Sequence, residues 1–141
     1  MKTFSLFIGM FLAVVVSAVL LLVFGVSFGR PSAASALYNP ATEVSITGAI
    51  EEVQDFTCPV SGREVGRHLQ LQTEDGIVQV HLLPSRILRS QRVEFKPGER
   101  IAVIGSKTHL LGKDAVIARE VIRGSDTFVF RDKSGSVMMQ Q

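Results

Sequence analysis

The sequence predicts an all-β domain, a five-stranded barrel with one short helix, which follows a single transmembrane helix near the N-terminus. The chain of 141 residues begins with a long apolar run, which is typical of a membrane-spanning helix. The remainder alternates between short patterned segments and turn residues, which is typical of strands. We therefore divide the chain into a membrane segment (1–29), a linker (30–41), a barrel (42–124) and a C-terminal hairpin or tail (125–141).

The apolar run extends from Phe4 to Phe28 without a charged residue or a proline. As a helix its 25 residues would be roughly 37 Å long, enough to cross a hydrocarbon core about 30 Å thick with modest tilt. Lys2 precedes the run and keeps the N-terminus in the cytoplasm. We expect a single-pass protein whose remaining domain lies on the periplasmic side of a bacterial membrane.

The same segment has one feature of a cleavable signal, an A-x-A pattern at residues 34–36 that would leave a mature N-terminus at Leu37. Against cleavage, the apolar run is longer than the about 7 to 15 residues of a usual signal sequence. Arg30 and Pro31 also separate the run from the A-x-A pattern. We favour an uncleaved anchor, with a signal segment as the alternative.

Composition restricts the classes of function. The chain has 15 Lys and Arg and 13 Asp and Glu. Without Lys2, which belongs to the membrane segment, the remaining net charge is about +1. Nucleic-acid binding needs several Lys or Arg side chains gathered on phosphates, so we expect no nucleic-acid partner. The one cysteine excludes an intramolecular disulfide, so the fold must rest on its packed core.

The first predicted strand covers residues 42–53, where apolar and polar side chains alternate. Gly48 interrupts this alternation, and so does the pair of Glu51 and Glu52, which predicts a bend or a β-bulge where the strand changes sheets. A loop is predicted next, over residues 55–67.

The next two strands form a predicted hairpin of residues 68–73 and 77–83, joined through a Glu-Asp-Gly turn. The apolar side chains that share its inward face are Leu69, Leu71, Val78, Val80 and Leu82. Parity then places His68 and His81 together on the outward face. We expect them directly across from each other with a four-residue loop, and one diagonal step apart with a two-residue loop.

The second half of the domain is predicted to contain a short helix, two strands and a final hairpin. Pro84 lies at the start of the helix, and Ile87 and Leu88 form its buried side. The predicted elements are a helix over residues 84–92, strands over 100–106 and 114–123 joined through a Gly-containing loop, and a hairpin of 127–131 with 136–139.

Three strands, a short helix and two further strands follow one another in the order of a Greek-key OB barrel. Two stretches resemble the OB-fold domains of small exported bacterial proteins, Phe95–Gly105 (FKPGERIAVIG) and Ala118–Val121 (AREV). The resemblance covers roughly residues 42–124 and implies the fold. It implies no single function, because OB barrels bind nucleic acids, sugars, metals, haem and other proteins. Another small barrel or a β-sandwich is the alternative.

His68, His81 and Cys58 form a candidate metal site. The histidines share one face of the hairpin and Cys58 lies in the loop that leads to it, so a thiol and two imidazoles can meet at one transition metal ion. Their spacing matches no zinc motif. The alternative is a polar, solvated face. Cys58 alone has three interpretations, namely a small buried side chain, a reactive thiol or a bridge to another chain.

The order of membrane segment, exported OB barrel and C-terminal tail is similar to that of the haem chaperone of bacterial cytochrome c maturation. That family has a His followed a few residues later by a Tyr, just after its barrel. The corresponding residues 123–131 contain neither, and Tyr38 lies in the linker. The chain also lacks a C-x-x-C-H motif for covalent haem. The similarity concerns the plan of the chain, and the haem chemistry does not transfer.

Arg86, Arg89 and Arg92 recur at every third residue and would line one side of the short helix. A solvated helix face is the simpler interpretation. A docking patch for an acidic protein partner or for anionic lipid headgroups is the functional interpretation.

The sequence shows no nucleophile with a base and no paired carboxylates, so we expect no enzymatic activity. The leading interpretation is a membrane-tethered, extracytoplasmic OB-fold binding module without a cofactor. It would act as an accessory, assembly or scaffold subunit of a membrane or envelope protein complex. The alternative is a metal- or haem-handling carrier that uses His68 and His81, with or without Cys58.

Overall fold

The computed structural model describes residues 36–139. The predicted membrane segment and most of the predicted linker lie outside this part. Within residues 36–139, no helix has the length and apolar character that crossing a membrane requires.

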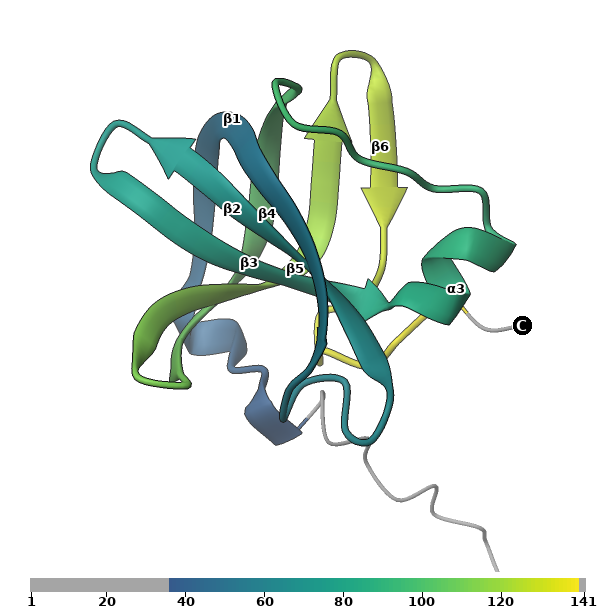
Figure 1. The fold of residues 1–141 in the computed structure, drawn as a ribbon. Coiled ribbons are helices and arrows are strands. Elements are labelled where there is room, and N and C mark those ends of the chain that lie inside the picture. Colours follow the sequence, from purple (N-terminus) through teal and green to yellow (C-terminus); the bar gives the residue numbers. More distant parts are fainter. Residues whose placement is uncertain (1–35, 140–141) are drawn as a thin grey trace, which may run out of the picture. The chain divides into compact units, whose positions relative to one another are not determined.

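The described part is a twisted β-sheet closed into a barrel, with one short α-helix (Figure 1). A 3-10 turn, η1 (Pro40–Thr42), precedes the sheet. The strands are β1 (Glu43–Thr57), β2 (Val65–Thr73), β3 (Gly76–Pro84), β4 (Arg100–Leu110), β5 (Lys113–Arg123) and β6 (Asp126–Val129), and the helix is α3 (Ser85–Ser90). Their order is β3-β2-β1-β4-β5-β6, and a parallel pairing of β3 with β5 closes the barrel. This closed order, with a helix between β3 and β4, is of the predicted OB type.

The long strand β1 holds the barrel together because it pairs with two neighbours. Its first half pairs with β4 and its second half with β2. The register shifts between Ile50 and Glu52, which confirms the predicted bulge. At Gly48, an added Cβ would collide with the carbonyl oxygen of Gln72, so glycine lets the two backbones approach closely.

The β2–β3 hairpin has a two-residue turn, because Thr73 pairs with Gly76. Gly76 has a φ of 120°, a conformation that side chains disfavour. The register continues unchanged from this turn to His68 and His81, which lie directly across from each other. Our expectation that a two-residue loop would place the histidines one diagonal step apart was therefore wrong, because this two-residue turn pairs them directly.

The barrel interior is aliphatic and almost fully buried. Leu69, Leu71, Val80 and Leu82 are between 0 and 2 % exposed, which confirms the predicted inward face of the hairpin. Leu88 of α3 is also fully buried and packs into the same core. This core is the main source of stability, because each buried side chain of this size is worth about 1.5 to 3 kcal/mol of transfer free energy.

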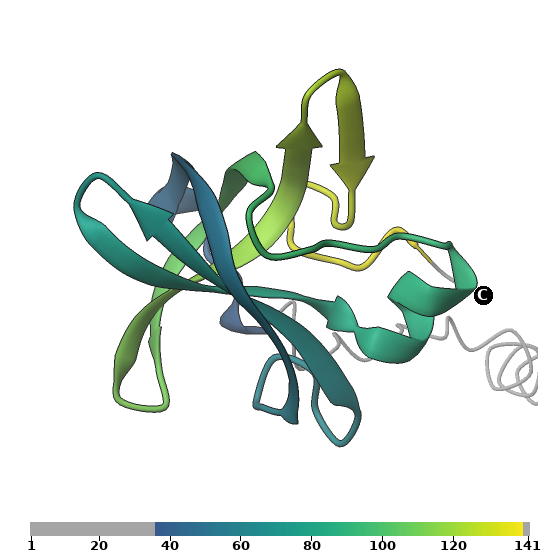
Figure 2. The same cartoon turned by 45° about the horizontal axis from the view of Figure 1, so that its top comes forward.

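The strands β1 and β2 extend into the predicted loop 55–67, β4 extends to Leu110, and two further elements differ from the prediction. The helix α3 ends at Ser90, so Arg92 lies beyond it with a φ of 56°. The chain after β5 turns back as β6 and extends the sheet, and Figure 2 shows this hairpin projecting from the barrel. The expected second pairing is reduced to one isolated bridge between Arg131 and Val137, because β5 provides a longer edge for the returning chain.

Candidate metal centre

The outward face of the β2–β3 hairpin is buried where the two histidines lie. His68 is 1 % and His81 is 0 % exposed. Our expectation that both side chains share one face is confirmed, but the expectation of a solvated face is wrong at this position. A second apolar cluster covers them, formed by Leu37, Tyr38, Phe56, Cys58, Val60, Leu110 and Ile117. Several of these residues belong to the predicted linker and loop, whose sequences gave no periodic sign of burial.

Cys58 meets both histidines, as the sequence suggested. Its Sγ lies 3.2 Å from His68 Nε2 and 3.4 Å from His81 Nδ1. The two imidazole rings meet edge to face, with ring centroids 4.5 Å apart. The three ligand atoms all lie within 4.8 Å of one another. One thiol and two imidazoles thus converge on a single point.

The surroundings hold these side chains in place. The Phe56 ring stacks on His68 at a centroid distance of 3.7 Å. Ser61 Oγ accepts a hydrogen bond from the Cys58 backbone N–H and lies 3.6 Å from Cys58 Sγ. Gly66 leaves room for the side chains of Ser61 and His68. An added Cβ would lie 2.9 Å from Ser61 Cβ and 3.2 Å from His68 Cε1. The remaining space admits no water-sized molecule, so a haem does not fit there.

Burial keeps both imidazoles neutral at pH 7. Desolvation lowers the pKa of His68 to about 4, and the nearby Asp55 carboxylate only partly opposes this. Desolvation also lowers the pKa of His81 to about 3, and the charges of His68 and Arg131 act in the same direction. Neutral imidazoles carry the free lone pair that a metal ligand needs.

Arg131 is a buried cation beside this cluster, at the end of the predicted hairpin strand 127–131, and the sequence analysis did not identify it as a site residue. It is 1 % exposed, and its guanidinium donates to the carbonyl oxygens of Ala118 at 2.7 Å and Leu82 at 2.8 Å. Within residues 36–139 it forms no ion pair with a carboxylate. Desolvation lowers its pKa to about 10, and ionisation of Tyr38 or Cys58 would oppose that shift. A single arginine in an irregular tail carries no signal of burial.

Three buried nitrogens of this cluster find no hydrogen-bond partner in the described part of the chain. They are His68 Nδ1, His81 Nε2 and Arg131 Nε, although the backbone carbonyl groups of Gly66 and Gln54 lie near the His68 ring and act to raise its pKa. Buried polar atoms of this kind usually cost stability, so a cluster that retains them calls for a functional explanation.

Tyr38 holds the segment before β1 against the cluster through a hydrogen bond to Glu43. Its hydroxyl donates to Glu43 Oε2 at 2.6 Å, and Arg119 donates to both oxygens of the same carboxylate at 2.8 Å. The Arg119 guanidinium and the Tyr38 hydroxyl lower the pKa of Glu43 to about 2. Burial and the Glu43 carboxylate raise the pKa of Tyr38 to about 12. Sequence reasoning missed this network because Arg119 lies 76 residues from Glu43 along the chain.

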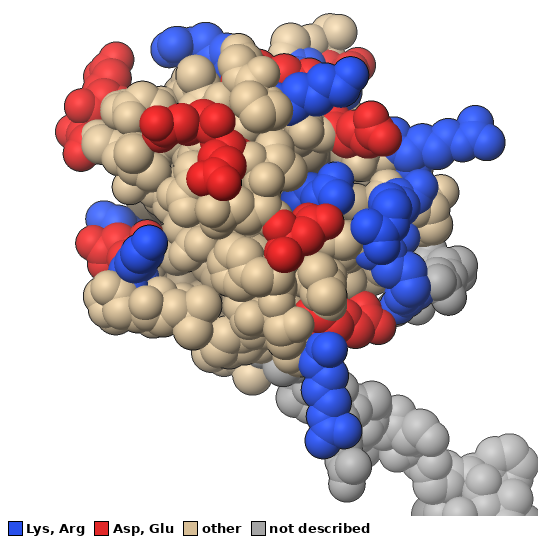
Figure 3. All heavy atoms as spheres, in the orientation of Figure 1, with Lys and Arg blue, Asp and Glu red and all other residues tan. Residues whose placement is uncertain are grey.

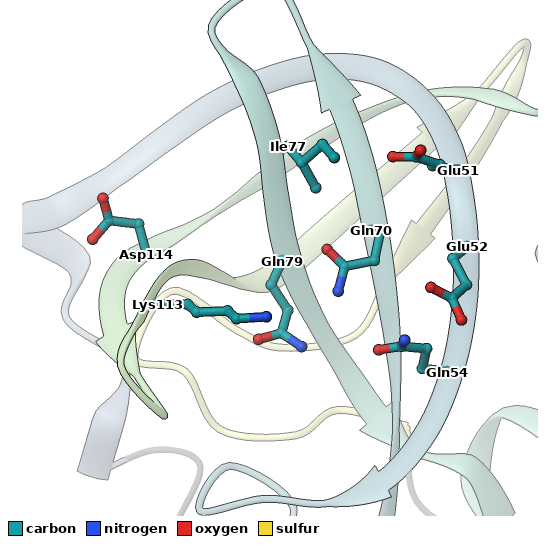
Figure 4. A pocket seen from close by; sticks show the side chains of 8 residues that line it. All are labelled: Glu51, Glu52, Gln54, Gln70, Ile77, Gln79, Lys113 and Asp114. Atoms are coloured by element: carbon teal, nitrogen blue, oxygen red, sulfur yellow. The ribbon is translucent and has the colours of Figure 1, made fainter.

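The same face of the hairpin opens into a polar groove beyond the histidines (Figure 4). The side chains of Gln54, Gln70 and Gln79 line its floor. Figure 4 shows two glutamates of β1 on one side and Lys113 and Asp114 on the other. The predicted polar, solvated face is therefore present only at the glutamine end of the hairpin.

The three candidate docking arginines do not form one helical row. Arg86 pairs with Glu64 at 3.1 Å, Arg89 lies in the last turn of α3, and Arg92 follows the helix. All three side chains are exposed. On the face in Figure 3, basic side chains gather on the side of the molecule where α3 lies, while elsewhere both signs are interspersed. Whether this patch binds a partner stays a prediction.

The sequence model of the MamS/MamX magnetosome protein family matches residues 42–128, which include all of β1 to β5 and all of β6 except its last residue, Val129. No curated protein matches the sequence.

Solved structures with a similar fold include the Stn1–Ten1 complex of S. pombe, at 14 % identity and a TM-score of 0.46 over 60 % of this chain and 59 % of that chain. An OBody bound to hen egg-white lysozyme matches at 12 % identity and 0.43, over 68 % and 95 % of the two chains. The mitochondrial single-stranded DNA binding protein Rim1 of S. cerevisiae matches at 11 % and 0.43, over 65 % and 96 %. The chain thus spans less than two thirds of the first of these proteins. No function follows from similarities this distant.

Proposed function

The chain belongs to the MamS/MamX magnetosome protein family, and we propose that it is a non-enzymatic accessory or assembly protein of the magnetosome. We also propose that residues 1–29 anchor the protein in a membrane and that the barrel lies on the periplasmic side. The support is the family match together with an apolar run long enough to cross a bilayer.

The chemistry of the described residues fits binding better than catalysis. Cys58 with His68 or His81 is the kind of thiol and imidazole pair that nucleophilic enzymes use. Here the pair lies in a space that admits no water-sized molecule, so a substrate has no route to the sulfur. The open groove carries glutamines and carboxylates without an adjacent nucleophile.

A protein partner suits the surface better than a nucleic acid. The net charge is only +2, and basic side chains gather only near α3 in the face that Figure 3 shows. Such a patch suits an acidic protein surface, whereas nucleic-acid binding needs many phosphate contacts. Arg86 and Arg89 are the side chains we propose for this docking.

The test is the size of the assembly in mild detergent. We expect the full chain to migrate in a native gel as a complex with other membrane proteins. Reversing the charge in Arg86→Glu/Arg89→Glu should release the protein from the complex, while the exposed loop variant Arg63→Glu should not. Migration of the parent protein as a monomer would contradict the proposal. The anchor is tested separately, because the protein should resist carbonate extraction and its intact mass should begin at or near Met1.

The second candidate function is metal handling, and the convergence of Cys58, His68 and His81 favours it. A carrier needs a site that binds a transition metal and releases it to a partner. Metal analysis of the protein purified through its intact anchor tests this candidate. A protein that neither contains nor takes up a transition metal would contradict it.

A further inference from the structure

We propose that the centre formed by Cys58 Sγ, His68 Nε2 and His81 Nδ1 binds a single copper ion in its monovalent state. This inference rests on the metal-handling function proposed above and specifies its metal. It follows from the ligand set, the closed space and the charge of the surroundings.

The ligand set is one that proteins use for copper. A trigonal arrangement of two imidazoles and one thiolate is characteristic of mononuclear copper sites, and thiolate ligands select soft ions such as Cu(I). In a trigonal arrangement, bonds of about 2.3 Å to sulfur and about 2.0 Å to nitrogen would separate the sulfur from each nitrogen by about 3.7 Å. The observed distances from Sγ are 3.2 and 3.4 Å. A movement of a few tenths of an ångström therefore makes room for the ion.

The closed space favours an ion that accepts few ligands. Zinc sites in proteins are almost always four-coordinate, with a fourth protein ligand or a water. Harder ions require more ligands, mostly oxygen. In the described part of the chain the centre offers three donors of the right kind, and no water-sized molecule fits beside them. Cu(I) is a soft ion that is stable at low coordination number, so three donors satisfy it.

The charge of the surroundings favours a monovalent ion. Cu(I) bound to the Cys58 thiolate forms a neutral unit, whereas a divalent ion would leave one positive charge. Arg131 already places a buried guanidinium beside the cluster, and among residues 36–139 no carboxylate pairs with it. A second buried positive charge near the first is unfavourable because the protein interior screens weakly.

The unpartnered ring nitrogen of His81 suggests that the copper is exchangeable. A metal-bound histidine usually donates its second ring N–H to an acceptor, and loss of that contact typically lowers metal affinity about 10 to 100-fold. His81 Nε2 finds no such acceptor in the described residues, whereas the backbone carbonyl groups of Gly66 and Gln54 lie near the His68 ring. A site without this support suits transfer of the ion to a partner better than permanent retention.

The test is competitive metal binding by the full chain in detergent micelles, without oxygen. We expect one Cu(I) per chain to be taken from the chelator bicinchoninate, and an excess of Zn(II) or Fe(II) should not displace it. Cys58→Ser, His68→Gln and His81→Gln should each lose this binding. His109→Gln is the matched control, because His109 is an exposed histidine that pairs with Asp114. X-ray absorption of the parent protein should show one sulfur and two nitrogen ligands, which tests the site without relying on a variant.

The outcomes separate the two proposals. Zn(II) or Fe(II) binding as tightly as Cu(I) at the same three residues would overturn the copper assignment and leave metal handling intact. Binding of no metal at all would overturn both. Copper that remains bound after all three substitutions, or that shows no sulfur ligand, would overturn the assignment to this centre.

Discussion

At its histidine end, the β2–β3 hairpin is equally buried on its two faces, but the two faces differ in chemistry. The inner face presents Leu69 and Val80, and the outer face presents His68 and His81 at neighbouring positions, all of them at most 1 % exposed. Aliphatic side chains gain free energy when they leave water, whereas buried imidazoles with unpartnered nitrogens lose it. Equal burial therefore has opposite energetic consequences on the two faces. The barrel core accounts for stability, and the outer cluster is where a function other than stability should be sought.

The largest effect on stability should come from the inner face. Leu71→Ala should lower the free energy of unfolding by on the order of 2 to 5 kcal/mol, because it leaves a cavity in a fully buried core. Gln70→Ala, at the next position and facing the open groove, should change it by about 0.5 kcal/mol or less. Denaturant unfolding of both variants measures the difference, and equal losses would contradict the assigned faces.

The outer face should make the fold sensitive to mild acid. His68 and His81 have folded-state pKa values of about 4 and about 3, below the 6.5 of an unfolded histidine. As the pH falls below 6.5 the unfolded chain takes up protons that the folded chain does not, so stability is lost. The loss should approach about 1.4 kcal/mol per pH unit for each histidine, down to the folded-state pKa.

The control for this acid sensitivity is a substitution of an exposed histidine in place of a buried one. Unfolding measured at a series of pH values should show a smaller slope between pH 6.5 and 5 in His81→Gln. The exposed variant His109→Gln should keep the slope of the parent protein. An unchanged slope in His81→Gln would show that this histidine is solvated and charged in the folded protein.

Sequence reasoning succeeded where the chain is periodic and failed where it is not. Alternation predicted the strands, the inward leucines and the shared face of His68 and His81. It missed the burial of that face because the covering residues Tyr38 and Val60 lie in irregular segments. Long-range contacts decide their position, such as the hydrogen bond from the Asn39 N–H to Ser106 Oγ at 3.0 Å. Arg131 was missed for the same reason.

A smaller effect is expected from loosening the segment that covers the outer cluster. Glu43→Gln removes the charge that Arg119 and Tyr38 share, and should lower stability by about 1 kcal/mol, because this pair is only partly buried. It should also speed up the reaction of the Cys58 thiol with a soluble disulfide reagent. Asp126→Asn, which affects only a loose pair with Arg123 at 4.0 Å, is the control. Equal labelling rates in the two variants would show that this network does not control access to Cys58.

Among the buried positions, the smallest effect on stability should come from Cys58→Ser. The hydroxyl occupies nearly the same space as the thiol and can exchange hydrogen bonds with the two imidazoles that now contact sulfur. We therefore expect a change within about 1 kcal/mol, compared with several for Leu71→Ala. The same variant should lose the uptake of Cu(I), because a serine hydroxyl is not a soft ligand. Unfolding and Cu(I) titration of one preparation measure both quantities. A loss of stability as large as that of Leu71→Ala, together with unchanged copper uptake, would assign Cys58 to the core and remove the chemical distinction between the two faces.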